Sequence, residues 1–517
     1  MGNTLAHGSV TEDQMTVGNA PLSQFRGCSC HHAPLRLQAE TPPAPPAGPV
    51  DTLFSYNPQD RHVMEPGTKL IPGVIQGAKK NPETDKAMLN VGLEPVEGKY
   101  VYKAEDPRQN AAVTFSTAAS TINAFREAFG DFKWSFKYDK LAINPNGGKD
   151  FNAFYSRNNG TINFFSEEDP IFGRQVFSGA SGEIVAHETG HAILDAIRPE
   201  YFGAFRTDVG AFHEAFGDML AIHMSLLDER VVKRVVVQTG GDLKKPNIAA
   251  YMAEELAQGL NNKKGKNATG GDYLRNANNN FTWAEPKTLP EKGGPDKLGW
   301  EIHDFSRLWT ASHFDVLNGL VQERIQAGAA PDVAIRESNK ELLKMLANLL
   351  KEAPRGDFTY KDMAIAFIKS DKIHGQGKHS ELLQKVFTDR KILPADLPPE
   401  TLDVAPAREQ ARLFQSSDDP GYGQMGVTLG QDFGMFSGAK VEIPVASDRI
   451  LFKSDELQEQ TQDDIRRLIK AGRIRYNDPT YQMKFPNDYF NPQGEPYIGA
   501  VTWDGNQMKI ERLAIAH

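Results

Sequence analysis

The chain is poor in cysteine, with only Cys28 and Cys30 among its 517 residues. Two cysteines one residue apart cannot form a disulfide framework. The sequence also has no run of 18 apolar residues, which argues against a membrane span, and its first thirty residues lack the basic and apolar regions of a Sec signal. We expect a protein that is cytoplasmic as synthesised, with export by a signal-less route left open.

Basic residues are fewer than acidic ones, with 58 Lys and Arg against 67 Asp and Glu, which gives a formal net charge of -9. No run of basic residues interleaved with aromatics occurs, so nucleic acid is not an expected partner. Apolar residues make up 39% of the chain, which is enough to bury a core without covalent cross-links. The oligomeric state cannot be read from these features.

Composition and periodicity divide the chain into four parts and predict an α+β fold class. Residues 1–50 form a polar, Pro-rich leader that we expect to be disordered. Residues 51–197 form an α+β lobe, and residues 198–395 form a mainly α lobe with a long loop over 239–300. Residues 396–517 are an accessory C-terminal segment whose role the sequence does not indicate.

Several local elements follow from the pattern of apolar residues and turn residues. We expect helices over 111–129 and about 209–227, and a further helix that begins near Ser181 and ends at Arg198-Pro199. A hairpin is predicted over 150–165, because Asn159-Gly160 separates two short β-like runs. The pattern is again helical from Asp304 to about 390 and around 455–471, with a β-like run at 497–502.

The helix that begins near Ser181 contains an HExxH motif, His187-Glu188-Thr189-Gly190-His191. Residues four apart lie on one face of a helix, so both imidazoles can reach one metal ion. This geometry suits zinc. Glu188 lies next to the first histidine without being needed as a ligand, and its carboxylate can take a proton from a metal-bound water.

The third ligand decides the class of enzyme. A metzincin would need Gly and His where Leu194 and Ile197 stand, so that class is excluded. Further along, Glu214 lies on the next predicted helix with Asp218 four residues later. Glu214 can complete a site of two histidines and one carboxylate that leaves a position for water, and Asp218 can orient a ligand imidazole.

In these residues the chain resembles the thermolysin family of gluzincins (peptidase family M4), in which an HExxH helix precedes a helix carrying Glu-Ala and, four residues later, Asp. The positions that match are His187, Glu188, His191, Glu214 and Asp218, with Asp195 also at a family aspartate. The resemblance, over about residues 100–390, implies a two-lobed catalytic domain with a central zinc helix and one zinc ion.

The resemblance also implies roles for residues outside the two helices. Asn152-Ala153-Phe154 is similar to the family's edge strand that grips substrate, and Arg275 and His303 match a substrate-binding arginine and an oxyanion-stabilising histidine. Tyr201 is the nearest candidate for the family's assisting tyrosine. His213 replaces an asparagine beside the third ligand, as a ligand-orienting residue or a spare ligand.

The family's paired calcium site is matched only in part. Glu183 stands at one of its carboxylate positions, whereas Ser225 stands where another carboxylate would be. Whether the protein binds calcium is therefore left open.

The sequence predicts a zinc metalloendopeptidase, a hydrolase that cleaves peptide bonds of protein or peptide substrates through a metal-bound water activated by Glu188. Two alternatives stay open. One is a zinc-binding but inactive interaction module, against which the presence of Glu188 argues. The other is an aminopeptidase on the same scaffold, for which the chain shows no Gly-x-Met-x-Asn-type signature. The physiological substrate and any need for proteolytic activation are not indicated.

Overall fold

A computed structural model describes the chain from residue 49 to residue 513. Gaps in the described residues fall at 62, 76–88, 91–92, 94, 104–105, 107, 139, 266–268, 270, 404–421, 447–453, 479–490 and 493–496. The chain separates into two units, Met1–Pro45 and Pro46–His517, and every described residue belongs to the second. The leader predicted over residues 1–50, up to residue 48, and both cysteines lie outside the described residues.

The amino-terminal part of the described unit is mixed α+β. Its elements are β1 (Pro49–Tyr56), β2 (Gly67–Ile75), β3 (Leu89–Asn90), α1 (Arg108–Phe129), β4 (Leu141–Asn144), β5 (Ala153–Ser156), β6 (Thr161–Phe164), β7 (Ser166–Glu168), β8 (Gln175–Phe177), η1 (Ser178–Ala180) and α2 (Gly182–Ile197). One sheet has the order β3-β4-β6-β5, so β5 lies at its edge. The predicted hairpin is the antiparallel pair β5–β6, with Ser156 opposite Thr161, and the predicted first helix is α1.

Helix α2 begins and ends where its flanking residues require. The side chain of Ser181 caps its first turn by accepting a hydrogen bond from the backbone N–H of Ile184 at 3.4 Å. At the other end the N–H of Arg198 still bonds to the carbonyl of Leu194 at 2.7 Å, and Pro199 then begins a separate turn. The cap at Ser181 and the proline at position 199 therefore predict both ends of this helix correctly.

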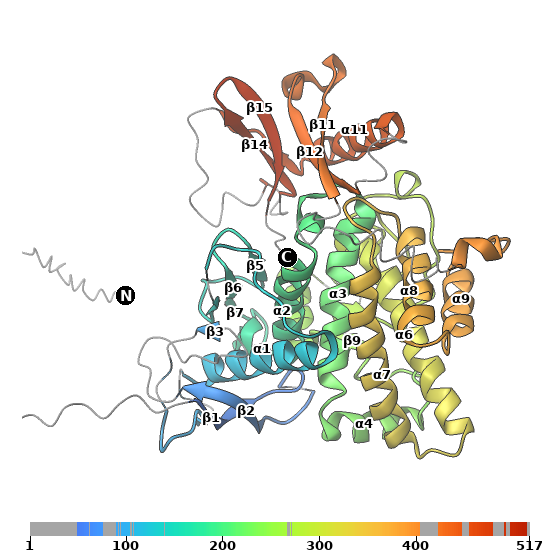
Figure 1. The fold of residues 1–517 in the computed structure, drawn as a ribbon. Coiled ribbons are helices and arrows are strands. Elements are labelled where there is room, and N and C mark those ends of the chain that lie inside the picture. Colours follow the sequence, from blue (N-terminus) through green and yellow to red (C-terminus); the bar gives the residue numbers. More distant parts are fainter. Residues whose placement is uncertain are drawn as a thin grey trace, which may run out of the picture. The chain divides into compact units, whose positions relative to one another are not determined.

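The central part of the chain is mainly helical (Figure 1). Its elements are η2 (Pro199–Gly203), α3 (Thr207–Ser225), α4 (Glu229–Thr239), β9 (Tyr251–Met252), α5 (Glu254–Lys264), β10 (Arg275–Asn276), η3 (Pro286–Thr288), α6 (Ile302–Gln326), α7 (Pro331–Glu352), α8 (Tyr360–His374), α9 (Ser380–Asp389) and η4 (Pro399–Leu402). Helix α3 packs against both α2 and α6, so it lies in the middle of the helical layer.

The segment 239–300, predicted as one long loop, contains regular structure. Helix α5 lies within it, and β9 and β10 pair antiparallel with Arg275 opposite Met252. The prediction was wrong here because α5 buries only four residues, Glu255, Leu256, Ala257 and Gly259. So few apolar positions give no helical period that a sequence pattern can detect.

The C-terminal segment folds into a five-stranded sheet with one long helix, drawn in orange and red in Figure 1. Its elements are β11 (Tyr422–Thr428), η5 (Gln431–Phe436), β12 (Lys440–Ala446), α11 (Ser454–Lys470), β13 (Ile474–Arg475), β14 (Gly499–Asp504) and β15 (Gln507–Arg512), in the sheet order β11-β12-β15-β14-β13. Both the charged helix predicted around 455–471 and the β-like run at 497–502 appear in it.

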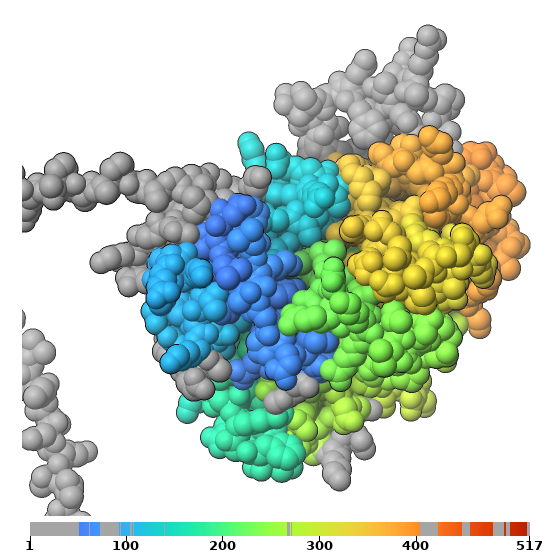
Figure 2. Space-filling model, turned by 90° about the horizontal axis from the view of Figure 1, so that it is seen from below, coloured from blue at the N-terminus to red at the C-terminus, as the bar shows by residue number. Residues whose placement is uncertain are grey.

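This segment is attached to the helical part by polar contacts. The backbone N–H of Asp357 donates to the carbonyl of Pro444 at 2.8 Å, and the guanidinium of Arg512 donates to the carbonyl of Ala204. Figure 2 shows another face of the unit, where blue and cyan amino-terminal segments adjoin green and yellow segments of the chain. In the described part of the chain no helix is long and apolar enough to cross a membrane.

Candidate metal centre

Helices α2 and α3 bring the two histidines of the HExxH motif to the carboxylate of Glu214. The Nε2 atom of His187 lies 3.5 Å from one carboxylate oxygen of Glu214, and the Nε2 atom of His191 lies 3.6 Å from the other. All three side chains are buried, and one ligand atom from each lies within 4.8 Å of the others. This group could bind a metal ion.

Two glycines allow the helices to approach closely enough. A Cβ atom on Gly190 would lie 3.0 Å from the Cα atom of Gly217, and a Cβ atom on Gly217 would lie 2.6 Å from Nδ1 of His187. Such separations are too short for a methyl group, so any larger residue would push α3 away from α2. The small residues between the ligands are therefore part of what brings Glu214 to the histidines.

Two further side chains contact the Nδ1 atoms of the two imidazoles. Nδ1 of His187 lies 3.0 Å from a carboxylate oxygen of Asp218, whose other oxygen accepts a hydrogen bond from Thr310 at 3.1 Å. Nδ1 of His191 lies 2.8 Å from Nδ1 of His213. Burial lowers the pKa of His213 to about 4, so its ring is neutral and its Nδ1 atom can accept a hydrogen bond from the Nδ1–H of His191.

The donor set fits a zinc ion. Ligand atoms that each lie about 2.0 to 2.1 Å from a tetrahedral zinc are about 3.3 Å apart, close to the 3.5 and 3.6 Å separations between the imidazoles and Glu214. Because Asp218 and His213 occupy the two Nδ1 atoms, both Nε2 atoms are directed at the shared site. His213 thus contacts Nδ1 of His191 and supports that residue, rather than serving as a spare metal ligand.

Glu188 lies in the same buried region, with an exposed fraction of 2%. Burial raises the pKa of its carboxyl to about 8, and the nearby Glu214 carboxylate acts in the same direction. Burial by itself lowers the pKa of His187, but hydrogen bonds to Asp218 and Glu214 outweigh it and raise that pKa to about 9. A cation bound here would displace protons, because its ligands must be deprotonated.

His303 reaches the site from the first turn of α6. Its Nε2 atom lies 3.5 Å from Glu214, and its Nδ1 atom lies 2.7 Å from a carboxylate oxygen of Glu301. The other carboxylate oxygen of Glu301 accepts the backbone N–H of His303 at 3.1 Å and so caps the helix. One carboxylate therefore sets both the position and the ring orientation of His303.

Arg275 lies among the carboxylates of the site. Its Nη1 atom is 2.6 Å from Asp218 and 3.5 Å from Glu214. The pairing of β10 with β9 and its packing on α6 place the arginine there. The guanidinium thus compensates buried negative charge.

Two residues predicted around the metal lie elsewhere. The hydroxyl of Tyr201 donates to the carbonyl of Pro354 at 2.5 Å in the core, so it does not face the metal ligands. Asp195 accepts hydrogen bonds from Tyr155 at 2.7 Å and from Arg157 at 3.1 Å rather than orienting a ligand histidine. Its carboxylate instead ties helix α2 to strand β5.

Asn152 and Ala153 lie at the start of the edge strand β5, which packs on α2. The side-chain oxygen of Asn152 accepts the N–H of Ala153 at 2.8 Å. Strand β6 occupies one edge of β5, and among the described residues no strand pairs with the other edge. An open strand edge beside a metal site can pair with an extended peptide.

A second group of acidic residues lies at the start of α2. Asp60, Glu183 and Glu254 each offer a carboxylate oxygen, and these oxygens lie within 4.8 Å of one another. The side-chain nitrogen of Gln59 donates to Glu183 at 3.3 Å. Burial raises the pKa of Glu183 well above its usual range, and the neighbouring carboxylates add to this.

Sequence reasoning missed Glu301, Thr310, Asp60 and Glu254. Glu301 has a local signal, because an acidic residue before a helical pattern is a cap candidate and stands two residues from His303. The other three have none, since each is brought to its site by a distant part of the chain.

Comparison with known proteins finds similarity only among solved structures. The sequence matches no protein-family model, and no curated protein matches it. Among solved structures, the chain is similar to the precursor of protealysin, a metalloproteinase from Serratia proteamaculans, with a TM-score of 0.39 and 14% sequence identity over 67% of this chain and 90% of that one. A likeness this distant supports no conclusion about activity. Such a conclusion has to rest on the buried group of His187, His191 and Glu214.

Proposed function

We propose that this chain is a zinc-dependent endopeptidase. The observation that supports the proposal is the buried group of His187, His191 and Glu214, with Glu188 beside it. A purely structural zinc site is closed by four protein ligands, whereas a catalytic site has three and an adjacent base. The described residues offer three ligands and one such base.

A zinc ion held by these ligands would polarise a peptide carbonyl and lower the pKa of a coordinated water. Glu188 would take the proton that this water loses, and would then pass it to the nitrogen of the leaving amine. Burial raises the pKa of the Glu188 carboxyl, which favours its holding the proton between these two steps.

His303 is proposed to donate a hydrogen bond from Nε2 to the carbonyl oxygen as negative charge develops there. Glu301, at 2.7 Å from Nδ1, would keep the ring turned for this contact. We assign Arg275 to hold Asp218 in place and to present its remaining N–H groups to a substrate carbonyl. Strand β5, from Asn152 and Ala153, would pair with the extended substrate.

The substrate would then lie between the α+β lobe of residues 51–197 and the mainly α lobe of residues 198–395, with α2 as the floor of the cleft. This placement follows from the open edge of β5 on one side and His303 on the other. Ligand clefts commonly form between two such lobes.

The test is hydrolysis of an internally quenched peptide with blocked ends, together with the zinc content of the purified protein. We expect about one zinc per chain, loss of cleavage after removal of the metal with a chelator, and recovery when zinc is restored. The same peptide with a free amino terminus separates endopeptidase from aminopeptidase activity. Zinc-loaded protein that cleaves neither peptide would favour the inactive interaction module, and protein without zinc affinity would refute the site itself.

The acidic group of Asp60, Glu183 and Glu254 supports a second cation, calcium, in this proposal. Calcium prefers carboxylate and amide oxygens. Besides the three carboxylates, the side-chain oxygen of Gln59 is fully buried and has no hydrogen-bond partner among the described residues, although the amide nitrogen of the same side chain contacts Glu183. Two buried carboxylates and the half-buried Glu254, placed together, need protons or a cation to compensate their charge.

We expect calcium to raise the melting temperature of the zinc-loaded protein, because a ligand that binds only the folded state stabilises it, by roughly 2.7 kcal/mol at a hundredfold excess over Kd. Glu254→Gln should remove most of this response and leave the zinc content unchanged. The matched control is Glu229→Gln, on the exposed face of α4, which should respond to calcium like the wild type. An unchanged melting temperature of the wild type across millimolar calcium would contradict the assignment.

A further inference from the structure

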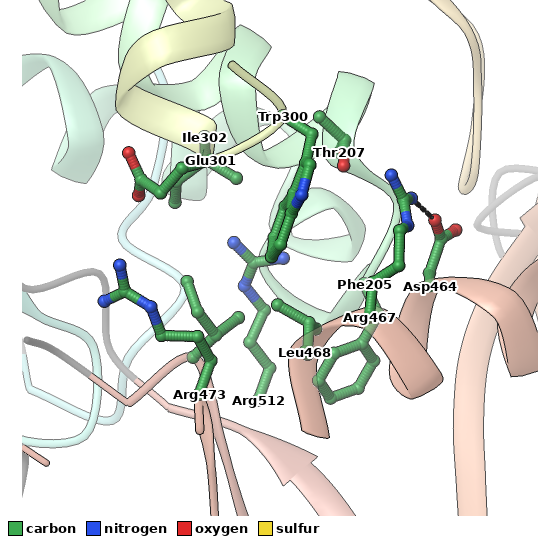
Figure 3. A pocket seen from close by; sticks show the side chains of 11 residues that line it. Phe205, Thr207, Trp300, Glu301, Ile302, Asp464, Arg467, Leu468, Arg473 and Arg512 are labelled. Atoms are coloured by element: carbon green, nitrogen blue, oxygen red, sulfur yellow. Dashed lines mark hydrogen bonds and ion pairs between the residues drawn. The ribbon is translucent and has the colours of Figure 1, made fainter. Parts of the chain in front are cut away.

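A pocket lies where the C-terminal segment meets the start of α6 (Figure 3). Trp300, Glu301 and Ile302 line it from the helical part of the chain, and Arg473 and Arg512 line it from the C-terminal segment. In Figure 3 the guanidinium groups of both arginines extend from the segment toward the side where Glu301 lies. The C-terminal segment thus places positive charge beside the carboxylate that holds His303.

Arg473 is the more deeply buried of the two arginines. Only 1% of its surface is exposed, and a buried arginine needs negative partners to offset the loss of its hydration. Its Nε atom donates to Glu291 at 2.9 Å. The backbone carbonyl of Glu291 in turn accepts a hydrogen bond from the N–H of Glu301 at 2.9 Å. Arg473 is therefore linked through Glu291 to the loop segment that contains Glu301.

Arg473 also acts on the charge of Glu301. Burial by itself raises the pKa of the Glu301 carboxyl, but the neighbouring His303 and Arg473 outweigh burial and hold that pKa below its usual range. Glu301 is therefore ionised, and an ionised acceptor makes the stronger hydrogen bond to an imidazole N–H. The bond in question is the 2.7 Å contact from Glu301 to Nδ1 of His303.

We propose that Arg473 is a positioning residue of the active site, which fixes His303 through Glu301, and that the segment 422–513 is in this way an integral part of the catalytic unit. The inference rests on the proposed peptidase function. It also gives a role to a part of the chain that lies beyond residues 100–390, where the sequence resemblance ends.

The experiment compares Arg473→Gln, Arg473→Lys, Glu301→Gln and the double variant Arg473→Gln/Glu301→Gln in the full-length, zinc-loaded protein. Arg473→Gln should lower kcat about tenfold with KM and zinc content unchanged, whereas Arg473→Lys, which keeps the charge, should recover most of the loss. The double variant should be no slower than Glu301→Gln alone, because Arg473 acts through Glu301. The matched control, Arg466→Gln, removes an arginine of α11 that pairs with Asp432 and Asp463, and should match the wild type.

A second measurement does not depend on cleavage. In protein labelled with ¹⁵N-histidine, the hydrogen-bonded Nδ1 proton of His303 should be seen in the wild type and in Arg473→Lys, and be lost or broadened in Arg473→Gln. Unchanged kcat and an unchanged His303 signal in a folded Arg473→Gln variant would overturn the proposal. The proposal would also be overturned if the losses of kcat in Arg473→Gln and Glu301→Gln multiplied in the double variant. The same holds if Arg473→Gln lowered the zinc content and melting temperature and Arg473→Lys did not restore them. If the wild type cleaves nothing, the peptidase function fails, and the His303 signal still tests the Arg473–Glu301–His303 arrangement.

Discussion

Glu188→Gln is expected to lower kcat/KM for a peptide by about a thousandfold or more while the protein keeps its zinc. Glutamine has nearly the shape of glutamate and would fill the same buried space, but it cannot take a proton from water. General base catalysis contributes about 10² to 10⁴ in rate. Because Glu188 is not one of the three ligands, the metal content should stay at the wild-type level.

The measurement pairs the steady-state rate with zinc analysis of the same sample and a melting temperature. The control is again Glu229→Gln, an exposed glutamate of α4 with a side-chain exposure of 71%, which should leave all three quantities unchanged. Residual activity of Glu188→Gln above a tenth of the wild-type value would show that another group removes the proton, and Glu188 would lose the role given to it here.

Glu214→Ala should abolish cleavage by a different route, through loss of the metal. The two imidazoles that remain can still bind zinc, but a site with one ligand fewer and an unfilled buried space holds it far more weakly. The variant also leaves Arg275 without one of its two carboxylate partners. We expect the zinc affinity to fall by several orders of magnitude, measured by competition with a coloured chelator.

The matched control for Glu214→Ala is Asp218→Asn, four residues along the same helix. Asp218 contacts Nδ1 of His187 and is not a ligand, and loss of such a supporting contact costs about 10- to 100-fold in metal affinity or activity. The two variants should therefore differ clearly in zinc affinity. If Glu214→Ala bound zinc as tightly as the wild type, the third ligand would have to be another residue.

Local features of the sequence predicted the elements that hold the histidines. The spacing of His187 and His191, the cap at Ser181 and the stop at Pro199 all depend on residues within a few positions of each other, and the structure has the helix where they place it. The hairpin β5–β6 follows from Asn159-Gly160 in the same way, because Gly160 takes the positive φ of 59° that a tight turn needs. Hydrogen bonds along a helix or across a hairpin join near neighbours, so a local pattern can encode them.

The spacing of acidic residues on the next predicted helix extended the prediction to Glu214 and Asp218, and the resemblance to thermolysin-like enzymes extended it to His303. The structure brings all three together with the two histidines. The same transfer failed for Tyr201, whose hydroxyl bonds to Pro354 in the core, and for Asp195, which ties α2 to β5. A motif position fixes where a residue stands along a helix. It does not fix which distant side chain that residue meets.

By itself, therefore, the sequence determined helix α2, the pair of histidines on its face and the neighbouring Glu188. Tertiary structure alone decided what surrounds them: His213 against His191, Arg275 against Asp218, and Arg473 in the pocket that Glu301 also lines. The reason is that a single charged residue on a loop or strand has no periodicity, and its partner depends on the path of the whole chain. Burial then makes such pairings obligatory, because a charge removed from water must find an opposite charge or a hydrogen bond wherever the fold has put it.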